Sequence, residues 1–185
     1  MSRGGFSVDN DSVVHSWAMF RLVRRVARSP RGERFERTFV STPGAVATVA
    51  VTDEGDVLLV SQYRASLAAV IEEIPAGMRD VVGEDPAVTA VRELKEETGY
   101  TATHIEFLGT CLSSPGVTDS SVDVYLATGL HAGETEPHGP EEDEMTLEVV
   151  PFAEALRRVD TGEITDAKTA FGLLMAARRH PHLVR

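Results

Sequence analysis

Long apolar segments separated by polar turns organise most of the chain. AVATVAVT, which follows Pro43-Gly44, and VLLVSQYR are nearly continuous in apolar residues and flank the acidic turn DEGD. Two β-branched runs around a glycine-containing turn predict a β-hairpin. Because these runs lack polar alternation, both strands are expected to be covered on both faces. HIEFLGTCL and VDVYLATGL predict two further strands.

Helical spacing of apolar residues predicts helices at FAEALRRV, at TDAKTAFGLLMAARR and over residues 86–98. The last of these has clear boundaries, because Asp85 suits the N-cap, Pro86 the first turn and Gly99 the position just past the end. Four apolar residues share the arc of this helix that we expect to face the core: Ala87, Ala90, Val91 and Leu94. Helices interspersed with strands predict an α/β (α+β) fold with helices layered around a mixed sheet.

The N-terminal part of the chain differs from the rest in its pattern of polar and apolar residues. Residues 1–12 are polar and are expected to form a flexible N-terminus. Residues 13–42 mix arginines with apolar residues around the turn Pro30-Arg31-Gly32, which predicts an N-terminal β-hairpin arm. Residues 43–185 would then form the main domain, with AGETEPHGPEEDE at 132–144 as an exposed acidic loop.

Composition narrows the possible functions. The 185 residues carry a formal net charge of −11, so a basic surface for nucleic acid or an anionic membrane is not expected. Cys111 is the single cysteine, which excludes a disulfide framework. The N-terminal segment lacks the apolar core of a secretory signal, and no apolar run reaches the length of a membrane span. A cytoplasmic protein is expected.

The stretch VRELKEETGY concentrates three glutamates on one helix. Glu93, Glu96 and Glu97 fall beside the apolar arc, although like charges three or four residues apart cost roughly 0.2–0.5 kcal/mol per pair. One interpretation is a solvated acidic face balanced by Arg92 and Lys95. The other is a cation site, because Mg²⁺ takes carboxylate oxygens together with water and substrate phosphates.

The wider segment EEIPAGMRDVVGEDPAVTAVRELKEETGY resembles the Nudix box, and the chain is identified on this basis as a member of the Nudix superfamily. The matching positions are Gly77, Glu84, Arg92, Glu93, Leu94, Glu96, Glu97 and Gly99. Tyr100 replaces an aliphatic residue. Six residues separate Gly77 from Glu84 where the box has five, which leaves the role of Glu84 open.

The flanking segments are similar to the ADP-ribose pyrophosphatase branch of this superfamily: QYR at 62–64, EEIPAG at 72–77 and SSPGVTDSSVDVYLATGL at 113–130. The insertion before Glu84 is similar to actinobacterial members. The resemblance implies a mixed sheet sandwiched between helices. It also implies hydrolysis of ADP-ribose to AMP and ribose 5-phosphate, and a homodimer whose N-terminal strands exchange contacts.

The resemblance also assigns the metal site and the base. Glu93 and Glu97, with Glu96 next, would bind Mg²⁺ or alternatively Mn²⁺, together with the backbone carbonyl of Ala76. Glu96 is also counted among the catalytic residues. The base would come from the acidic loop. We select Glu142 for this role, with Glu141 and Glu144 as rivals.

Substrate contacts are expected outside the box. Arg64 would meet a phosphate or the adenine face, unless it is a plain surface arginine. Glu73 would accept hydrogen bonds from the substrate or hold a second metal ion, with a salt bridge to Arg92 as the alternative. Gly116, in the Ser113–Gly116 loop, would line the ribose end, although Ser120 stands where the branch often has an acid. Gly77, Arg92 and Gly99 are expected to be structural.

Other functions stay open at this stage. The same chemistry would serve another nucleoside diphosphate sugar, an oxidised nucleotide or a dinucleotide. A Nudix protein that senses ADP-ribose without cleaving it is a second class, but all the box glutamates are present here. Isomerisation of an isoprenoid diphosphate would need a catalytic cysteine, for which Cys111 within a strand is poor support. His180 and His182 are expected to belong to a tail rather than to a metal site.

Overall fold

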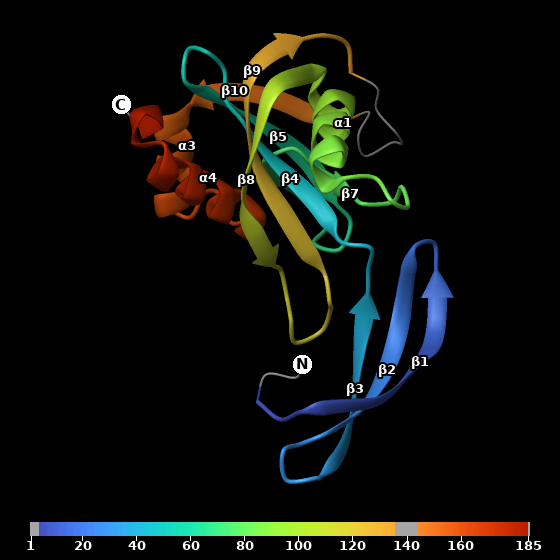
Figure 1. Cartoon of the computed structure of the whole chain (residues 1–185). Helices are drawn as coiled ribbons and strands as arrows, with labels where there is room; N and C mark the ends of the chain where they lie inside the picture. Colours follow the sequence, from blue (N-terminus) through green and yellow to red (C-terminus); the bar gives the residue numbers. More distant parts are fainter. Residues whose placement is uncertain (1–3, 136–143, 185) are drawn as a thin grey trace. The chain divides into compact units, whose positions relative to one another are not determined.

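The computed structural model describes residues 4–135 and 144–184 (Figure 1). Its strands are β1 (Ser7–Trp17), β2 (Phe20–Arg28), β3 (Arg34–Ser41), β4 (Ala45–Ala50), β5 (Asp56–Arg64), β6 (Ala69–Glu73), β7 (Ala76–Met78), β8 (Tyr100–Leu112), β9 (Ser121–Ala132) and β10 (Thr146–Pro151). Its helices are α1 (Pro86–Thr98), α3 (Phe152–Asp160), α4 (Ala167–Arg179) and the short 3-10 helix η1 (Pro181–Val184). None of the helices in the described ranges is long and apolar enough to cross a membrane.

The chain forms two compact units. The smaller unit holds the N-terminal strands up to Gly44 together with Leu112–Ser121, and the larger unit holds Ala45–Cys111 and Val122 onwards. The segment 112–121 joins the smaller unit because Val40 pairs with Thr118 and the Val40 carbonyl accepts the Thr118 hydroxyl at 2.8 Å. Besides the expected arm at 13–42, the smaller unit therefore contains a segment that lies about 70 residues further along the sequence.

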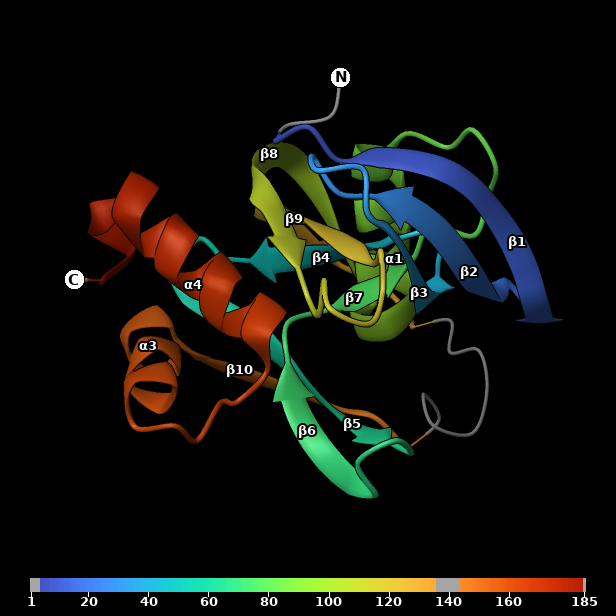
Figure 2. The ribbon, with the colours of Figure 1, turned by 90° about the horizontal axis from the view of Figure 1, so that it is seen from below.

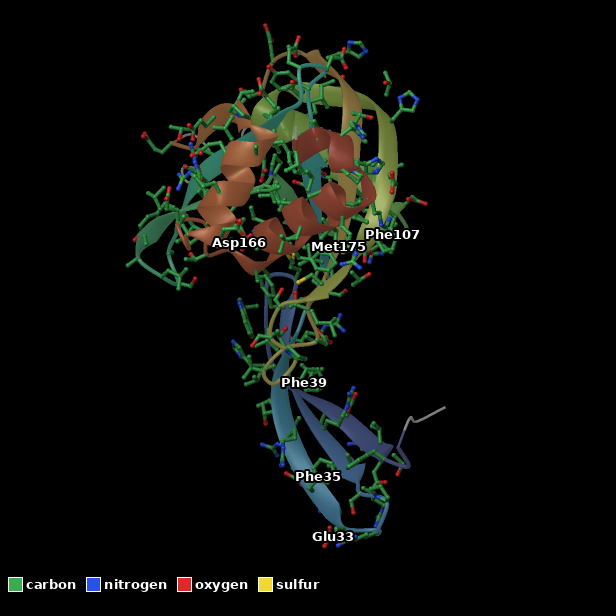
Figure 3. All side chains as sticks on the ribbon, turned by 90° about the vertical axis from the view of Figure 1, so that its left-hand side faces the viewer. Glu33, Phe35, Phe39, Phe107, Asp166 and Met175 are labelled. Carbon is green, nitrogen blue, oxygen red and sulfur yellow. The ribbon has the colours of Figure 1, made fainter. Side chains whose placement is uncertain are left out.

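The smaller unit is an antiparallel sheet in the order β1-β2-β3. The predicted hairpin is present as β2 and β3, and Gly32 adopts a positive φ of 83° in its turn. Residues 7–12, which lie within the segment expected to be flexible, pair with β2 through their backbone, and every side chain of β1 is exposed. The guanidinium carbon of Arg25 lies 4.9 Å from the ring centre of Phe39, and that of Arg37 lies 5.1 Å from the ring centre of Phe35; both phenylalanines are labelled in Figure 3.

The larger unit contains two sheets. One is antiparallel in the order β10-β5-β6, and the other is mixed in the order β7-β4-β9-β8. Strand β4 pairs antiparallel with β7 and parallel with β9. Both predicted strands are present as β4 and β5, but the predicted hairpin between them was wrong, because they belong to different sheets and share only an isolated bridge between Val51 and Val57. The expected mixed sheet is confirmed.

Helices cover both faces of the mixed sheet, as Figures 1 and 2 show. Alternate residues of a strand point to opposite faces. Val46 therefore packs in a cluster with Ala90 of α1, whereas Val49 packs in the main core with Leu173 of α4. Helix α4 packs closely on β4 at Gly172, since a Cβ added there would lie only 2.8 Å from a methyl group of Val49. The double coverage predicted from the continuous apolar run of β4 is confirmed.

The predicted C-terminal helices complete the main core. Phe152 and Ala155 of α3 and Leu173 and Ala176 of α4 are almost fully buried. Burying an aromatic or leucine side chain stabilises a fold by roughly 1.5–3 kcal/mol. These two helices fix the far side of the sheet and leave α1 to present its polar residues on the near side.

Candidate active site

Helix α1 begins and ends where the sequence predicts. The Asp85 carboxylate accepts a hydrogen bond from the Ala87 amide at 2.8 Å, and Pro86 occupies the first turn. Gly99 follows the helix with a φ of 76°, and its amide donates to the Lys95 carbonyl at 2.8 Å. A Cβ at Gly99 would lie 2.8 Å from the Gly133 carbonyl, so a side chain fits neither the backbone conformation nor the space.

The buried face of α1 is rotated from the expected one. Ala90 and Leu94 are buried as expected, but Val91 is only half-buried. Glu97 and Thr98 instead lie on the inner face, with 9% and 4% of their surface exposed. The Glu97 carboxylate accepts the Ala76 amide of β7 at 3.0 Å, so a hydrogen bond across to the sheet accompanies the burial of a carboxylate.

Arg92 is the centre of a carboxylate cluster. Its Nη1 lies 2.8 Å from Glu93 and 3.1 Å from Glu96, and its Nη2 lies 3.2 Å from both Glu84 and Asp80. Glu84 also accepts the Thr89 hydroxyl at 2.8 Å. One guanidinium therefore faces four carboxylates, and Asp80 comes from the loop that carries the additional residue of the box. Arg92 and Glu84 hold this loop on the helix.

Glu93 lies against the backbone of Gly77. A Cβ at Gly77 would come within 1.9 Å of a Glu93 carboxylate oxygen. Burial of the Glu93 carboxyl raises its pKa to about 7; Arg92 works against this shift, and the neighbouring charges of Glu96 and Asp80 add to it. Glu93 is thus an acid held in a tight, negatively charged position where a further positive charge would be stabilising.

The chemistry of this donor set fits a hard divalent cation. Glu93, Glu96 and Glu97 supply carboxylate oxygens on one side of α1, and β7 runs beside them. In the conformation described here, however, no three Asp, Glu, His or Cys side chains among residues 4–135 and 144–184 are arranged so that they could hold a metal ion. Arg92 is the cation that Glu93 and Glu96 meet.

A second charged cluster lies at the end of β5. Arg64 binds Glu73 in a two-pronged pair, Nε to Oε1 at 2.8 Å and Nη2 to Oε2 at 2.6 Å. The alternative pairing of Glu73 with Arg92 is wrong: β6, which carries Glu73, pairs with β5, and the Glu73 carboxylate binds Arg64 of β5. The Glu73 hydrogen bond raises the pKa of Arg64, and the charges of Glu97 and Asp166 contribute. Arg64 therefore lies within electrostatic reach of Glu97, one of the box carboxylates.

The structure adds two residues that the sequence reasoning missed. Lys168 of α4 contacts the Glu73 carboxylate and lies 3.0 Å from Asp166, the N-cap of the same helix. Asp166 (labelled in Figure 3) accepts the Thr169 amide at 2.9 Å. A lysine in the first turn of a helix opposes the helix dipole. That unfavourable placement was the available signal in the sequence.

The remaining predicted site residues lie elsewhere. Glu142, selected as the base, and its rival Glu141 lie outside the described residues, while Glu144 is exposed just before β10. Gly116 belongs to the smaller unit, where it lines a cavity of about 500 Å³ with Arg25, Arg37 and Phe39. A Cβ at Gly116 would meet no atom within 4 Å, so packing does not require glycine there.

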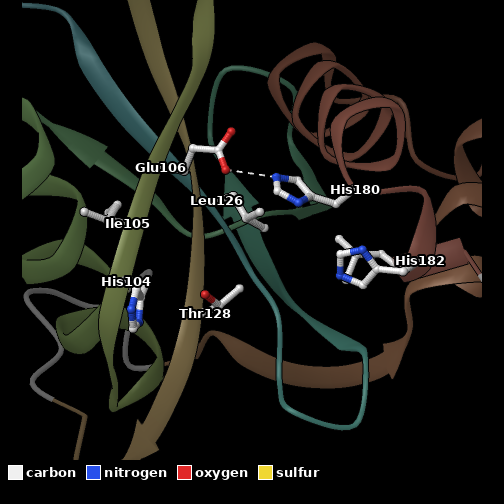
Figure 4. Close-up of a pocket in the computed structure, with 8 residues that line it drawn as sticks. His104, Ile105, Glu106, Leu126, Thr128, His180 and His182 are labelled. Carbon is white, nitrogen blue, oxygen red and sulfur yellow. Dashed lines mark hydrogen bonds and ion pairs between the residues drawn. The ribbon is translucent and has the colours of Figure 1, made fainter.

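The histidines of the C-terminal segment line a separate cavity of about 380 Å³ (Figure 4). His180, at the end of α4, lies 2.9 Å from Glu106 of β8, and the rings of His180 and His182 are 5.8 Å apart. No metal-binding group is formed here among the residues that the structure describes. His180 instead joins the end of α4 to β8.

Comparison with known proteins assigns the family. Residues 42–170 match the NUDIX domain, and the chain belongs to the Nudix family. It is 42% identical over 175 residues to the ADP-ribose pyrophosphatase of Mycobacterium tuberculosis, covering 94% of this chain and 84% of that protein. It is 42% identical over 144 residues to the ADP-ribose pyrophosphatase of Bacillus subtilis, covering 78% of this chain and 77% of that protein.

A solved structure has the same fold. The crystal structure of ADP compounds hydrolase superposes with a TM-score of 0.83, covering 98% of this chain and 97% of that chain at 21% sequence identity. The Nudix fold expected from the box, a mixed sheet between helices, is therefore confirmed.

Proposed function

We propose that this Nudix protein is a pyrophosphohydrolase that cleaves ADP-ribose to AMP and ribose 5-phosphate. Two relatives at 42% identity carry the name ADP-ribose pyrophosphatase, which supports this substrate. The single structural observation that carries the proposal is the surplus of carboxylates around Arg92, with Glu93 pressed against Gly77. One guanidinium does not neutralise four carboxylates, so this position favours a further cation.

We assign the metal site to Glu93, Glu97 and Glu96 with the Ala76 carbonyl, and the metal to Mg²⁺, with Mn²⁺ as a substitute. Bound Mg²⁺ would neutralise the pyrophosphate charge, orient the substrate and help to activate water. Glu97 would be fixed by the Ala76 amide and Glu93 by Gly77, so both carboxylates would be ordered before the substrate arrives. Arg92 and Glu84 would hold the loop around the site.

The other roles follow the charge of the substrate. Arg64, held by Glu73, would meet an anionic group. Glu142 would take the proton from the attacking water, and Gly116 would line the ribose end. These assignments rest on the resemblance to the ADP-ribose pyrophosphatase branch and on the pairing of Arg64.

We also propose that the chain forms a homodimer through its N-terminal strands. Strand β1 lies at the edge of its sheet, and Val8, Val13, Val14 and Trp17 are all more than two-fifths exposed. A long exposed edge strand with apolar side chains is a site for pairing with another chain. Light scattering should then give twice the mass of 20.0 kDa. A cytoplasmic location stays the expectation from sequence.

The test is turnover of ADP-ribose with Mg²⁺, measured beside GDP-mannose, NADH, a diadenosine polyphosphate and 8-oxo-dGTP. The Glu97→Gln variant is the control for the metal site. Release of AMP from ADP-ribose that exceeds the other substrates and is lost in Glu97→Gln would support the proposal. Faster cleavage of another substrate would keep the site and replace the substrate. Binding of ADP-ribose without cleavage of any compound would point to a sensor.

A further inference from the structure

A cavity of about 350 Å³ lies between the end of β5 and the start of α4 in the larger unit. Arg64, Glu73, Asp166 and Lys168 all line it, together with Ser66 and Thr165. These four charged side chains are two cations and two carboxylates, so the cluster is neutral as a whole. Lys168 of α4 and Asp166 at its N-cap supply half of these charges. The charge balance of the cluster therefore depends on the packing of α4 against the sheet.

Glu73 is the centre of this cluster. Only 3% of its surface is exposed, and both carboxylate oxygens are used: one accepts Arg64, and the other accepts both Arg64 and Lys168. Burial raises the pKa of this carboxyl, but the two cations outweigh burial and hold the pKa below its ordinary value. Glu73 is therefore a fixed anion that orients the guanidinium plane of Arg64.

Lys168 is itself fixed. Its side chain is 14% exposed and lies 3.0 Å from Asp166, which accepts the Thr169 amide at 2.9 Å and the Thr169 hydroxyl at 2.6 Å. The Thr169 hydroxyl in turn accepts the Ile74 amide at 2.9 Å, directly after Glu73 in the chain. The lysine thus connects Glu73 to the N-terminus of α4 through a continuous set of hydrogen bonds.

We propose that Lys168 is a positioning residue for the phosphorylated substrate: through Glu73 it fixes the Arg64 guanidinium, and it balances the charge of Asp166. This inference rests on the proposed hydrolysis of ADP-ribose. Arg64 uses Nε and Nη2 for Glu73, and its Nη1 takes no part in that pair, so one edge of the guanidinium faces away from the carboxylate. Without Lys168 the cluster carries a net negative charge, which repels an anionic ligand.

The first experiment compares Lys168→Met with the wild-type chain in steady-state hydrolysis of ADP-ribose. The expected result is a KM raised by at least roughly tenfold with a smaller change in kcat, the size expected for losing one unit charge near a partly exposed site. Lys168→Arg should restore the KM to within about threefold, because it keeps the charge. Lys168→Gln, which keeps a donor to Glu73 without the charge, provides a second neutral variant if Lys168→Met does not fold.

The second experiment tests whether Lys168 acts through Arg64. The KM change caused by Lys168→Met, or by Lys168→Gln, is measured again in the Arg64→Ala background. If the lysine works by orienting Arg64, the change should become markedly smaller there, because residues in one network are not additive, and the lost charge accounts for what remains. Equal changes in the two backgrounds would overturn the proposal.

Arg158→Met is the matched structural control. Arg158 is similarly enclosed, with 17% of its side chain exposed, and pairs with Glu72, the residue before Glu73 on β6. The Arg158→Met substitution should lower the unfolding temperature while leaving the KM for ADP-ribose unchanged. A KM change in Arg158→Met equal to that in Lys168→Met would mean that both act through general stability and would overturn the proposal. Wild-type protein without ADP-ribose turnover would overturn both the proposed function and this inference, whereas a normal KM in the lysine variants overturns this inference alone.

Discussion

Two arginine-centred clusters in the larger unit have similar contacts but differ in how many arginines neutralise their carboxylates. Arg158 of α3 lies within 3.1 Å of three carboxylates, from Glu72, Glu148 and Glu154. Arg92 of α1 lies within 3.2 Å of four, from Asp80, Glu84, Glu93 and Glu96. A second arginine, Arg157, shares Glu154 with the first cluster. Within the described residues, no second arginine pairs with the four carboxylates around Arg92.

The pKa values express this difference. Hydrogen bonds from Arg157 and then Arg158 lower the pKa of Glu154 to about 2, whereas burial raises the pKa of Glu93 to about 7. The α3 cluster has cations close to its carboxylates and is the kind of network that joins elements of a fold. The α1 cluster keeps surplus negative charge in a semi-enclosed position, which is typical of a site that awaits a cation.

The largest contrast should come from removing one charge in each cluster. Glu93→Gln is expected to lower kcat/KM for ADP-ribose by at least about 100-fold, because loss of a group that holds or orients a metal costs 10- to 100-fold or more. Glu154→Gln should change kcat/KM by less than about twofold, as surface substitutions usually do. Steady-state kinetics with Mg²⁺ checks both. Comparable losses in the two variants would show that the contrast has no functional meaning.

Gly77→Ala should disturb function more than folding. The added methyl overlaps the flexible end of Glu93, at 1.9 Å from its carboxylate oxygen, so that side chain moves away. We expect kcat/KM to fall by roughly 10- to 100-fold, the range for displaced metal-supporting groups. Unfolding free energy should drop by less than about 1 kcal/mol, because no core atom is removed. Kinetics and urea unfolding on the same sample measure both; a stable variant with normal kinetics would contradict this position for Glu93.

The stability of metal-free protein should fall between about pH 4.5 and pH 7. Folding raises the pKa of Glu93 from 4.5 to about 7, so in this window the folded chain holds a proton that the unfolded chain has lost. Unfolding free energy therefore decreases as pH rises through the window, by at most about 1.4 kcal/mol for each tenfold drop in proton concentration. Urea unfolding in EDTA at pH 5 and pH 8 measures the decrease.

Glu93→Gln is the control for this pH dependence, because it removes the titrating group and leaves the other carboxylates in place. Its pH profile should be flatter than that of the wild-type chain. Saturating Mg²⁺ should also flatten the wild-type profile, since the metal binds the deprotonated carboxylate. Parallel profiles for the wild-type chain and the variant would disprove the assignment to Glu93.

The smallest effect on catalysis is expected at the α3 cluster. Arg158→Met leaves Glu72 and Glu148 without their closest cation and should lower the unfolding free energy by roughly 1–3 kcal/mol. Its kcat/KM for ADP-ribose should stay within about twofold of wild type. Thermal unfolding and kinetics check the pair of outcomes. A tenfold loss of activity without loss of stability would place Arg158 in the functional site.

Local signals predicted much of the fold and the centre of the site. Asp85, Pro86 and Gly99 set the bounds of α1, because capping depends on a few consecutive residues. The continuous apolar run of β4 predicted helices on both sides of the sheet. Strands β1, β6, β7 and β10 were missed, since they are short, polar or adjacent to turns and gain their stability from pairing with a neighbour.

The sequence by itself determined the box carboxylates, their helix and the family that they define, because all of these depend on short-range spacing. Only the tertiary structure decided that Glu97 turns inward to the Ala76 amide, that Asp80 joins Arg92, and that Glu73 pairs with Arg64 and with Lys168, 95 residues away. Which charged side chains pair depends on the distance between them and on their burial. These are set when strands and helices pack together, and no local pattern of residues contains them.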